Sequence, residues 1–153
     1  MSFVREGDAI SVKFDPEDVE VLRSVLTQVS GLIAEGDSAD PALARLFPDI
    51  YADDPEAAAE IRKYTQSDLK QEKLDAAGVL IGQLGEHVTL TTDQADAWLR
   101  ALNDARLVLA IRLGIGEDFD IEGEDDPIDE DPDVWTWIYR YLSYLQASLI
   151  DVL

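Results

Sequence analysis

Carboxylates are the most frequent chemically active side chains in this sequence, and one stretch of them has the spacing of a calcium loop. Positions 1, 3, 5, 6 and 12 of the EF-hand pattern are occupied by Asp118, Asp120, Glu122, Gly123 and Asp129. The pattern is imperfect, because Asp125 replaces the usual apolar residue and Pro127 interrupts the exit. Such a match arises easily in an acid-rich segment. A loop without a metal is therefore the favoured prediction, and cation binding is the alternative.

Catalytic signatures are missing from the sequence. It contains no glycine-rich phosphate loop, no G-x-S-x-G motif and no H-E-x-x-H motif, and it contains no cysteine. The single histidine, His87, opens a predicted strand without a second ligand or an acid–base partner, so we expect it at the surface. The sequence predicts a protein that is not an enzyme and needs no cofactor.

Side chains suited to binding another protein are easier to find. Arg106 lies between Leu102 and Leu109 on an apolar stripe, where its guanidinium needs carboxylate or carbonyl partners. The last predicted helix carries more aromatic surface than one buried face can hide. The candidate partner-binding residues are Trp135, Trp137, Tyr139, Tyr144 and Arg106. In the simpler alternative, Arg106 fixes helix packing and the aromatic side chains only cap the core.

The charge is strongly negative. The chain has 12 basic and 33 acidic residues, a formal net charge of −21. Sequence-independent affinity for nucleic acid comes from Lys and Arg that neutralise phosphates, so we expect no direct DNA binding. The segment 117–133 holds 11 acidic and no basic residues and is predicted to be a loop, disordered or loosely ordered.

The longest helical pattern runs from Thr91 to Gly114, and the rest of the chain is predicted to pack around it. Thr91 and Gln94 have capping-box spacing, and Gly114 can adopt the left-handed conformation that ends a helix. Apolar residues recur every three or four positions, and of these Trp98, Leu102 and Leu109 are expected to be buried. Further apolar residues surround the C-terminal half. We expect a central helix that is exposed at its first turns and enclosed at its end. On the polar face, Asp96, Arg100 and Asp104 are spaced to form a charge ladder.

Further helices and two short strands complete the predicted fold. Helices are expected at about 16–35, 41–47, 56–64, 65–84 and 134–153, with a break near Thr65 or Ser67, and strands at 9–14 and 87–90. Each strand precedes a capped helix, a weak internal repeat in which the two strands can pair. At 153 residues the chain is expected to be one domain. The prediction is an all-α, single-domain helical bundle around the helix at about 91–114, with at most a minor two-stranded β element.

Three stretches of sequence resemble a known family. They are LARLFPDIYADDPEAAAEIRKYTQSDL at 43–69, WLRALNDARLVLAIRLGI at 98–115, and the C-terminal SYLQASLIDVL. On these stretches the chain resembles the actinobacterial domain-of-unknown-function family 2017. Some members of that family are described as oxidative-stress regulators of transcription that act through protein contacts. The resemblance implies a regulatory, protein-binding domain whose partner belongs to the transcription machinery.

These observations lead to one functional prediction and one alternative. The prediction is a non-enzymatic regulatory domain that binds a protein partner and does not bind DNA directly. A cytoplasmic location without membrane contact is expected, because the N-terminus lacks a signal-peptide layout and no apolar run is long enough to span a bilayer. Self-association as a homodimer is a further expected mode. Without cysteine, the input signal is not a thiol switch. The alternative is a small acidic metal- or ligand-binding protein.

Overall fold

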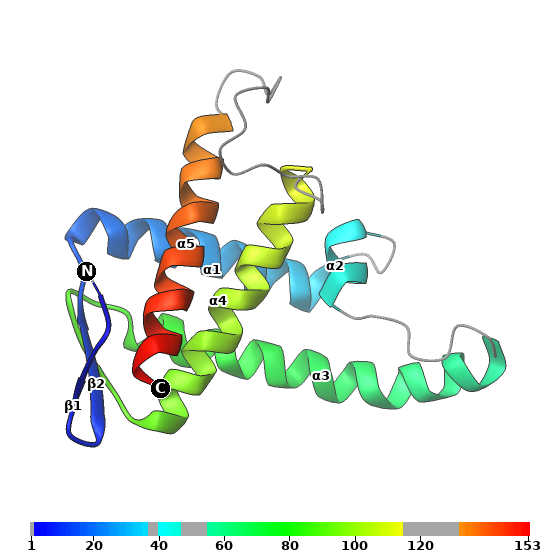
Figure 1. The fold of residues 1–153 in the computed structure, drawn as a ribbon. Coiled ribbons are helices and arrows are strands. Elements are labelled where there is room, and N and C mark those ends of the chain that lie inside the picture. Colours follow the sequence, from blue (N-terminus) through cyan, green and yellow to red (C-terminus); the bar gives the residue numbers. More distant parts are fainter. Residues whose placement is uncertain (1, 37–39, 47–54, 115–131) are drawn as a thin grey trace.

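The computed structural model describes residues 2–36, 40–46, 55–114 and 132–153. Five helices and three strands make up this part of the chain (Figure 1). In chain order the elements are β1 (Val4–Glu6), β2 (Ala9–Lys13), α1 (Pro16–Glu35), α2 (Pro41–Leu46), α3 (Pro55–Gln83), β3 (His87–Leu90), α4 (Thr92–Arg112) and α5 (Pro132–Val152). The predicted helical fold is confirmed.

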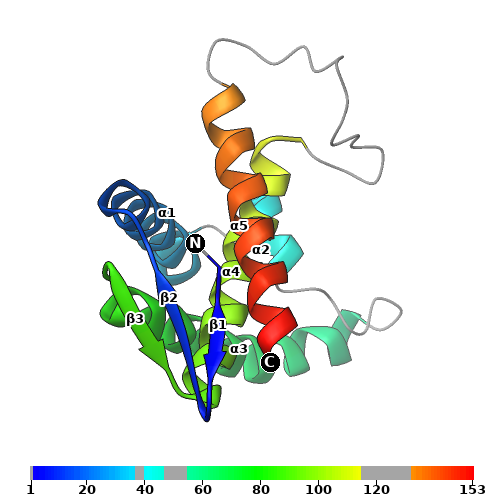
Figure 2. The same ribbon diagram turned by 60° about the vertical axis from the view of Figure 1, so that its left-hand side comes forward.

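Helix α4 lies at the centre of the molecule, as predicted. It contacts α1, α2, α3, α5, β2 and β3. Helix α5 runs antiparallel beside α4 in both views, while α1 and α3 cross behind and below them (Figures 1 and 2). Trp98 is fully buried in this core, between the rings of Phe3 and Phe14, and its indole N–H donates to Gln83 Oε1 at 3.0 Å.

Helix α4 begins and ends where the sequence predicted, but the position of its buried residues differs from the prediction. The Thr91 side chain accepts a hydrogen bond from the Gln94 amide, and the Gln94 side chain accepts one from the Thr91 amide, which completes the predicted capping box. Gly114 ends the helix with a φ of 71°. The buried residues fall between Ala95 and Leu109, and the last turn is partly exposed. The predicted enclosure of the helix end is wrong, because neighbouring helices cover the middle of α4.

The sheet has one strand more than expected. The order is β1-β2-β3, and both pairs are antiparallel. The predicted pairing of β2 with β3 is confirmed, with Val12 opposite Val88. The unexpected strand β1 forms a hairpin with β2 around Gly7 and Asp8, where Gly7 has a φ of 64°. A Gly-Asp pair between two short runs is a hairpin signal, although three residues are too few to show alternation.

Helix α3 corrects another prediction. It is continuous from Pro55–Gln83, so the expected break near Thr65 or Ser67 is wrong. Ser and Thr favour helix starts, but inside a helix their hydroxyls can point outward or bond the preceding turn. The local capping preference therefore does not end the helix here, and the buried core residues of α3 that the structure describes, Ala76, Ala77 and Leu80, all come later in the helix. Helix α1 begins where predicted, after Asp15 and at Pro16, although the Asp15 side chain makes no capping hydrogen bond.

The two ends of the described chain lie side by side. The Phe3 amide donates to Ser148 Oγ at 2.9 Å, and Arg5 Nε donates to the Val152 carbonyl at 2.8 Å. Figure 2 shows β1 beside the C-terminal half of α5. These contacts hold the last helix against the N-terminal hairpin and so determine which side of α5 faces solvent.

Candidate functional site

Helix α5 carries four of the five predicted partner-binding residues. It begins at Pro132, two residues earlier than expected, because proline is well tolerated in the first turn of a helix. Its buried stripe consists of Ile138, Leu142, Leu145 and Leu149. These residues recur every three or four positions and face the core. Aromatic side chains at other positions must lie on the flanks of α5 or in solvent.

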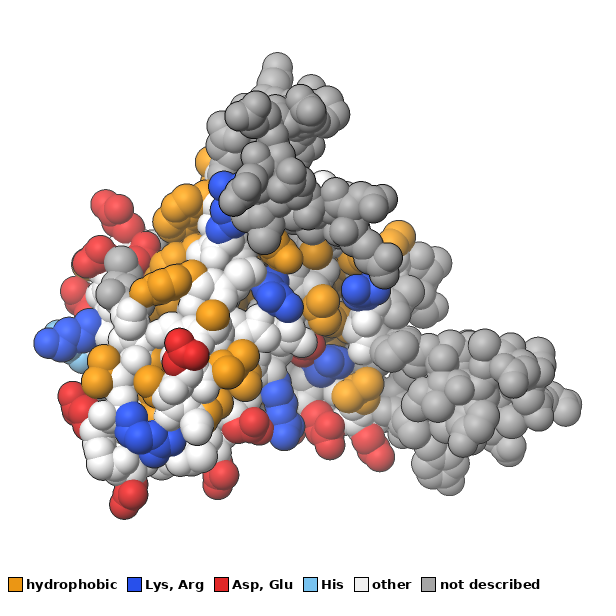
Figure 3. All heavy atoms as spheres, viewed as in Figure 1, with side chains coloured by type: hydrophobic (Ala, Val, Ile, Leu, Met, Phe, Trp, Pro, Cys, Tyr) orange, Lys and Arg blue, Asp and Glu red, His pale blue; other side chains and the backbone are white. Residues whose placement is uncertain are grey.

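Three of these aromatic side chains are accessible, as the sequence predicted. Trp135 is 39% exposed, Trp137 is 48% exposed and Tyr144 is 50% exposed. Tyr139 and Tyr141 are half-buried. Hydrophobic side chains over α5 and α4 reach the surface between charged ones in Figure 3. Aromatic side chains of this size bury large areas when they bind another molecule. Their exposure in the isolated chain is therefore typical of residues at an interface.

One flank of α5 faces the start of α1. Trp137 and Tyr141 stand one turn apart, and their rings stack with centroids 5.2 Å apart and an interplanar angle of 5°. The Tyr141 hydroxyl donates to Asp18 Oδ2 at 3.3 Å. The Tyr144 hydroxyl lies 2.6 Å from Ser2 Oγ. This flank is therefore an aromatic strip held between α1 and the N-terminal residues.

The electrostatics of this flank are negative. The pKa of Tyr141 is raised well above its ordinary value, first by burial and then by the charge of Asp18, with smaller effects of its hydrogen bond to Asp18, of Asp15 and of Tyr144. Tyr141 thus remains a neutral hydroxyl at physiological pH. It can continue to donate its proton to the Asp18 carboxylate.

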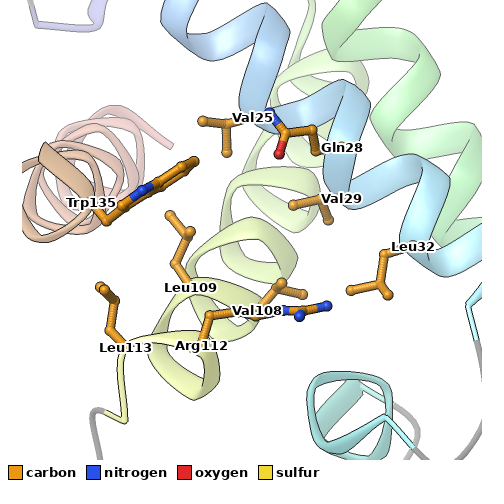
Figure 4. Close-up of a pocket in the computed structure, with 9 residues that line it drawn as sticks. All are labelled: Val25, Gln28, Val29, Leu32, Val108, Leu109, Arg112, Leu113 and Trp135. Atoms are coloured by element: carbon orange, nitrogen blue, oxygen red, sulfur yellow. The ribbon is translucent and has the colours of Figure 1, made fainter. Parts of the chain in front are cut away.

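The other flank of α5 borders an apolar cleft of about 450 Å³ (Figure 4). Trp135 reaches across it from α5 toward α1 and α4. The remaining lining residues are Val25, Gln28, Val29, Leu32, Val108, Leu109, Arg112 and Leu113. Arg112 bridges to Asp40 Oδ2 at 3.1 Å, so its charge is already paired at the rim. The sequence predicted that some aromatic side chains of α5 stay accessible, but it did not predict the cleft, which requires three helices to meet.

Arg106 lies in a polar cluster between α4 and α5. Its Nη2 donates to Asn103 Oδ1 at 3.5 Å, and Gln146 Nε2 donates to the same oxygen at 3.2 Å. Within the described residues, Arg106 Nε and Gln146 Oε1 are buried without a hydrogen-bond partner. The side chain is half-buried, and its acceptor is the side-chain carbonyl oxygen of Asn103, one of the two kinds of partner that the sequence predicted.

The structure divides the five predicted residues between two flanks. Trp137 and Tyr144 are seven residues apart on one side of α5, while Trp135 and Tyr139 are four residues apart on the other. Arg106 joins the second side through Asn103 and Gln146. The carboxylates beside Trp137 come from α1, and no spacing within α5 could have indicated them.

A buried ion pair was also missed. Lys73 Nζ lies 2.9 Å from Asp104 Oδ1, and Asp104 is the buried charged residue of the described core. Burial raises the pKa of Asp104, and Lys73 lowers it by hydrogen bonding and charge, with burial the larger effect. The predicted ladder is therefore wrong at Asp104. Of the three ladder residues, Asp96 and Arg100 form an ion pair on the surface, at 2.9 Å.

The remaining sequence candidates give no further site. His87 is exposed, as predicted. Among the described residues no group of three or more His, Cys, Asp or Glu side chains is placed to hold a metal ion. The calcium-loop candidate Asp118–Asp129 and most of the acidic segment 117–133 lie outside the described residues. No described helix is both long enough and apolar enough to span a membrane.

The fold and this surface together define a mainly helical protein in which a central helix supports an aromatic C-terminal helix beside exposed carboxylates. The chain belongs to the family described as a domain of unknown function (DUF2017), whose profile matches residues 1–153. It is 28% identical over 149 residues to the oxidative stress regulator AosR of Mycobacterium bovis and of Mycobacterium tuberculosis, an alignment that covers 73% of this chain and 68% of each relative.

A putative oxidative stress regulator AosR of Mycobacterium leprae is 27% identical over 172 residues, with 88% of this chain and 78% of the relative covered. No solved structure matches the chain.

Proposed function

We propose that this protein is a cytoplasmic stress-response regulator that acts by binding a protein partner, without catalysis and without direct contact to DNA. The names of its relatives support the regulatory part, since they are called oxidative stress regulators. The resemblance suggests a partner from the transcription machinery. Because the chain has no cysteine, thiol oxidation within the chain is not the stress signal. We propose that the partner transmits the signal or that the chain detects it by a different chemistry.

The observation that carries the proposal is the exposure of Trp135, Trp137 and Tyr144 on α5. Tryptophan and tyrosine are enriched among the few residues that supply most of the energy of an interface. In the isolated chain these side chains are in contact with water, and burying them against a partner would contribute favourable free energy to binding. Tyr139 and Arg106 would extend the interface along the second flank.

Partner capture with matched variants tests the proposal. Trp137→Ala removes an exposed ring, whereas Asp68→Ala removes an exposed side chain from α3, outside both flanks of α5. In cells, a photo-reactive residue at position 137 should crosslink a defined protein, and the same residue at position 68 should not. Trp137→Ala should reduce recovery of that protein about tenfold or more, as expected for an aromatic anchor.

Circular dichroism serves as the control for folding. Recovery that is unchanged by Trp137→Ala, Trp135→Ala and Tyr144→Ala would overturn the proposed interface. Crosslinks only between identical chains would instead identify the surface as that of a homodimer.

A second candidate function, the binding of a small apolar ligand, is favoured by the cleft beside Trp135. Its volume of about 450 Å³ lies within the range of small-molecule pockets, and its lining is mostly apolar. The fluorescent probe 1-anilinonaphthalene-8-sulfonate should bind there, and Val29→Phe, which fills the cleft, should remove the signal. Ile150→Phe should leave it unchanged. Calorimetric titration of the whole chain with Ca²⁺ tests the cation alternative at Asp118–Asp129.

A further inference from the structure

The flank of α5 that faces α1 combines open aromatic surface with negative charge. One face of the Trp137 ring is covered by Tyr141, so its 48% exposure belongs to the opposite face and the edges. Tyr144 continues the strip one turn further along, and its ring is half in solvent. The hydrogen bond from Tyr141 to Asp18 places this part of α5 near the start of α1.

The carboxylates next to the strip have no basic partner in the chain as described. Asp18 accepts a hydrogen bond from Tyr141, and Asp15 makes no capping bond although it precedes α1. Neither carboxylate forms an ion pair within the described residues. Glu17 and Glu20 of the first turns are exposed. Acidic side chains gather at the left of Figure 3, where the N-terminal end of α1 lies.

An open indole face beside carboxylates that form no ion pair within the described residues is an environment that a guanidinium group prefers. Arginine stacks on aromatic rings and at the same time donates hydrogen bonds to a carboxylate, which the compact ammonium group of lysine does less well. A second copy of the chain is a poor occupant, because it would bring the same carboxylates and another net charge of −21.

We propose that this acidic–aromatic face, formed by Trp137, Tyr141 and Tyr144 of α5 with Asp15 and Asp18 at the start of α1, binds an arginine-bearing segment of the protein partner. An arginine side chain lies on the open face of Trp137, and its guanidinium pairs with Asp18 or Asp15. This inference rests on the proposed function and names the chemistry of the partner at the same surface.

Synthetic peptides test the face without knowledge of the natural partner. The probe is the acetylated, amidated peptide Ala-Arg-Ala-Leu-Arg-Ala, and its counterparts carry lysine or glutamine in place of both arginines. The three tryptophans of the chain provide three indole N–H signals in a ¹H–¹⁵N spectrum. Trp137→Phe assigns one of them, and the signal of the fully buried Trp98 reports that the fold is intact.

The arginine peptide should shift the Trp137 signal, the lysine peptide should bind more weakly, and the glutamine peptide should cause no shift. Asp15→Asn combined with Asp18→Asn should weaken binding about fivefold, as expected for two partly exposed ion pairs. The matched control is Asp68→Asn with Asp93→Asn, which removes the same charge from exposed positions on α3 and α4. Its effect should stay below about twofold because those sites are distant and screened.

Three results would overturn the inference: equal weakening by the two double variants, a Trp137 signal that does not move, or equal binding of all three peptides. Capture of the cellular partner that depends on Trp137 but not on Asp15 and Asp18 would also overturn it, while the proposed function would stand. Peptide binding as expected, together with partner recovery that is unchanged by Trp137→Ala, Trp135→Ala and Tyr144→Ala, would contradict the proposed function and show that the face binds arginine but not this partner.

Discussion

At the scale of single residues, the ion pair between Lys73 and Asp104 joins α3 to α4 at the edge of the core. The Asp104 side chain is almost completely buried, and Lys73 retains some contact with water. A carboxylate in such a place is costly to ionise, which is why burial dominates the rise of its pKa in spite of Lys73. The pair stabilises the arrangement of the two helices only while both members are present.

Lys73→Met should therefore destabilise the fold by about 3 kcal/mol at neutral pH, because it leaves Asp104 buried without a cation. The pKa of Asp104 in the folded variant should rise further above its ordinary value of 3.8. The folded state then binds a proton that the unfolded chain has lost, so stability falls as pH rises through this window. Urea denaturation should show a smaller cost near pH 4.5 than near pH 7.5.

The double variant Lys73→Met with Asp104→Asn is the control for that experiment. It has no carboxylate at position 104, so the difference between its free energy of unfolding and that of the parent should not grow as the pH rises toward neutral. A cost of Lys73→Met that is the same at both pH values would show that Asp104 is not the group responsible.

At the scale of secondary-structure elements, α4 organises the molecule through its middle turns. Leu102 is fully buried where α4 meets its neighbours, whereas Leu109 lies about two turns later and lines the cleft beside Trp135. The same substitution should therefore have different costs at the two positions. A cavity formed at Leu102 is closed, and one formed at Leu109 adds to a space that already exists.

Leu102→Ala should cost about 3–5 kcal/mol and Leu109→Ala about 2 kcal/mol in the free energy of unfolding, because the penalty grows with the closed cavity left behind. Chemical denaturation of both variants measures the difference. Equal costs would mean that the cleft is packed in solution, and a cost below about 1 kcal/mol at Leu109 would contradict its place in the core.

At the scale of the whole molecule, the net charge of −21 governs how the protein meets other molecules. Only three ion pairs join described residues, and two of them lie partly in solvent. Most carboxylates of the described residues are therefore solvated and repel one another. This field disfavours contact with nucleic acid and favours a basic partner, in agreement with the charge beside Trp137.

The isolated chain should not bind duplex DNA measurably at physiological salt, because it lacks the clustered Lys and Arg that neutralise phosphates. An electrophoretic mobility assay over a range of protein concentrations measures this, with a basic DNA-binding protein as the positive control. A shift that weakens as salt is raised would contradict the prediction and indicate direct contact with the phosphates.

Salt should also stabilise the fold. Raising NaCl from about 10 mM to about 150 mM shortens the screening length from about 30 Å to about 8 Å, which reduces repulsion between carboxylates. The melting temperature should rise by roughly 2–5 °C. Asp68→Lys with Asp93→Lys, which reverses two exposed charges, should make that rise smaller. A melting temperature that falls with salt would show that attractive pairs dominate.

The sequence by itself determined the features that depend on neighbours along the chain. The capping box of Thr91 and Gln94, the left-handed Gly114 and the start of α1 at Pro16 all follow from contacts within one turn of helix. Periodicity likewise predicted the burial of Trp98 and Leu102 and the exposure of aromatic residues on α5.

Only the tertiary structure decided which distant groups meet. Asp18 accepts a hydrogen bond from Tyr141, which is 123 residues away in the sequence, and Lys73 pairs with Asp104, which is 31 residues away. No spacing rule links such pairs, because their separation depends on how helices pack and not on the turn of one helix. Local propensity was also not decisive for α3, which continues through Thr65 and Ser67 although a capping side chain contributes about 1 kcal/mol.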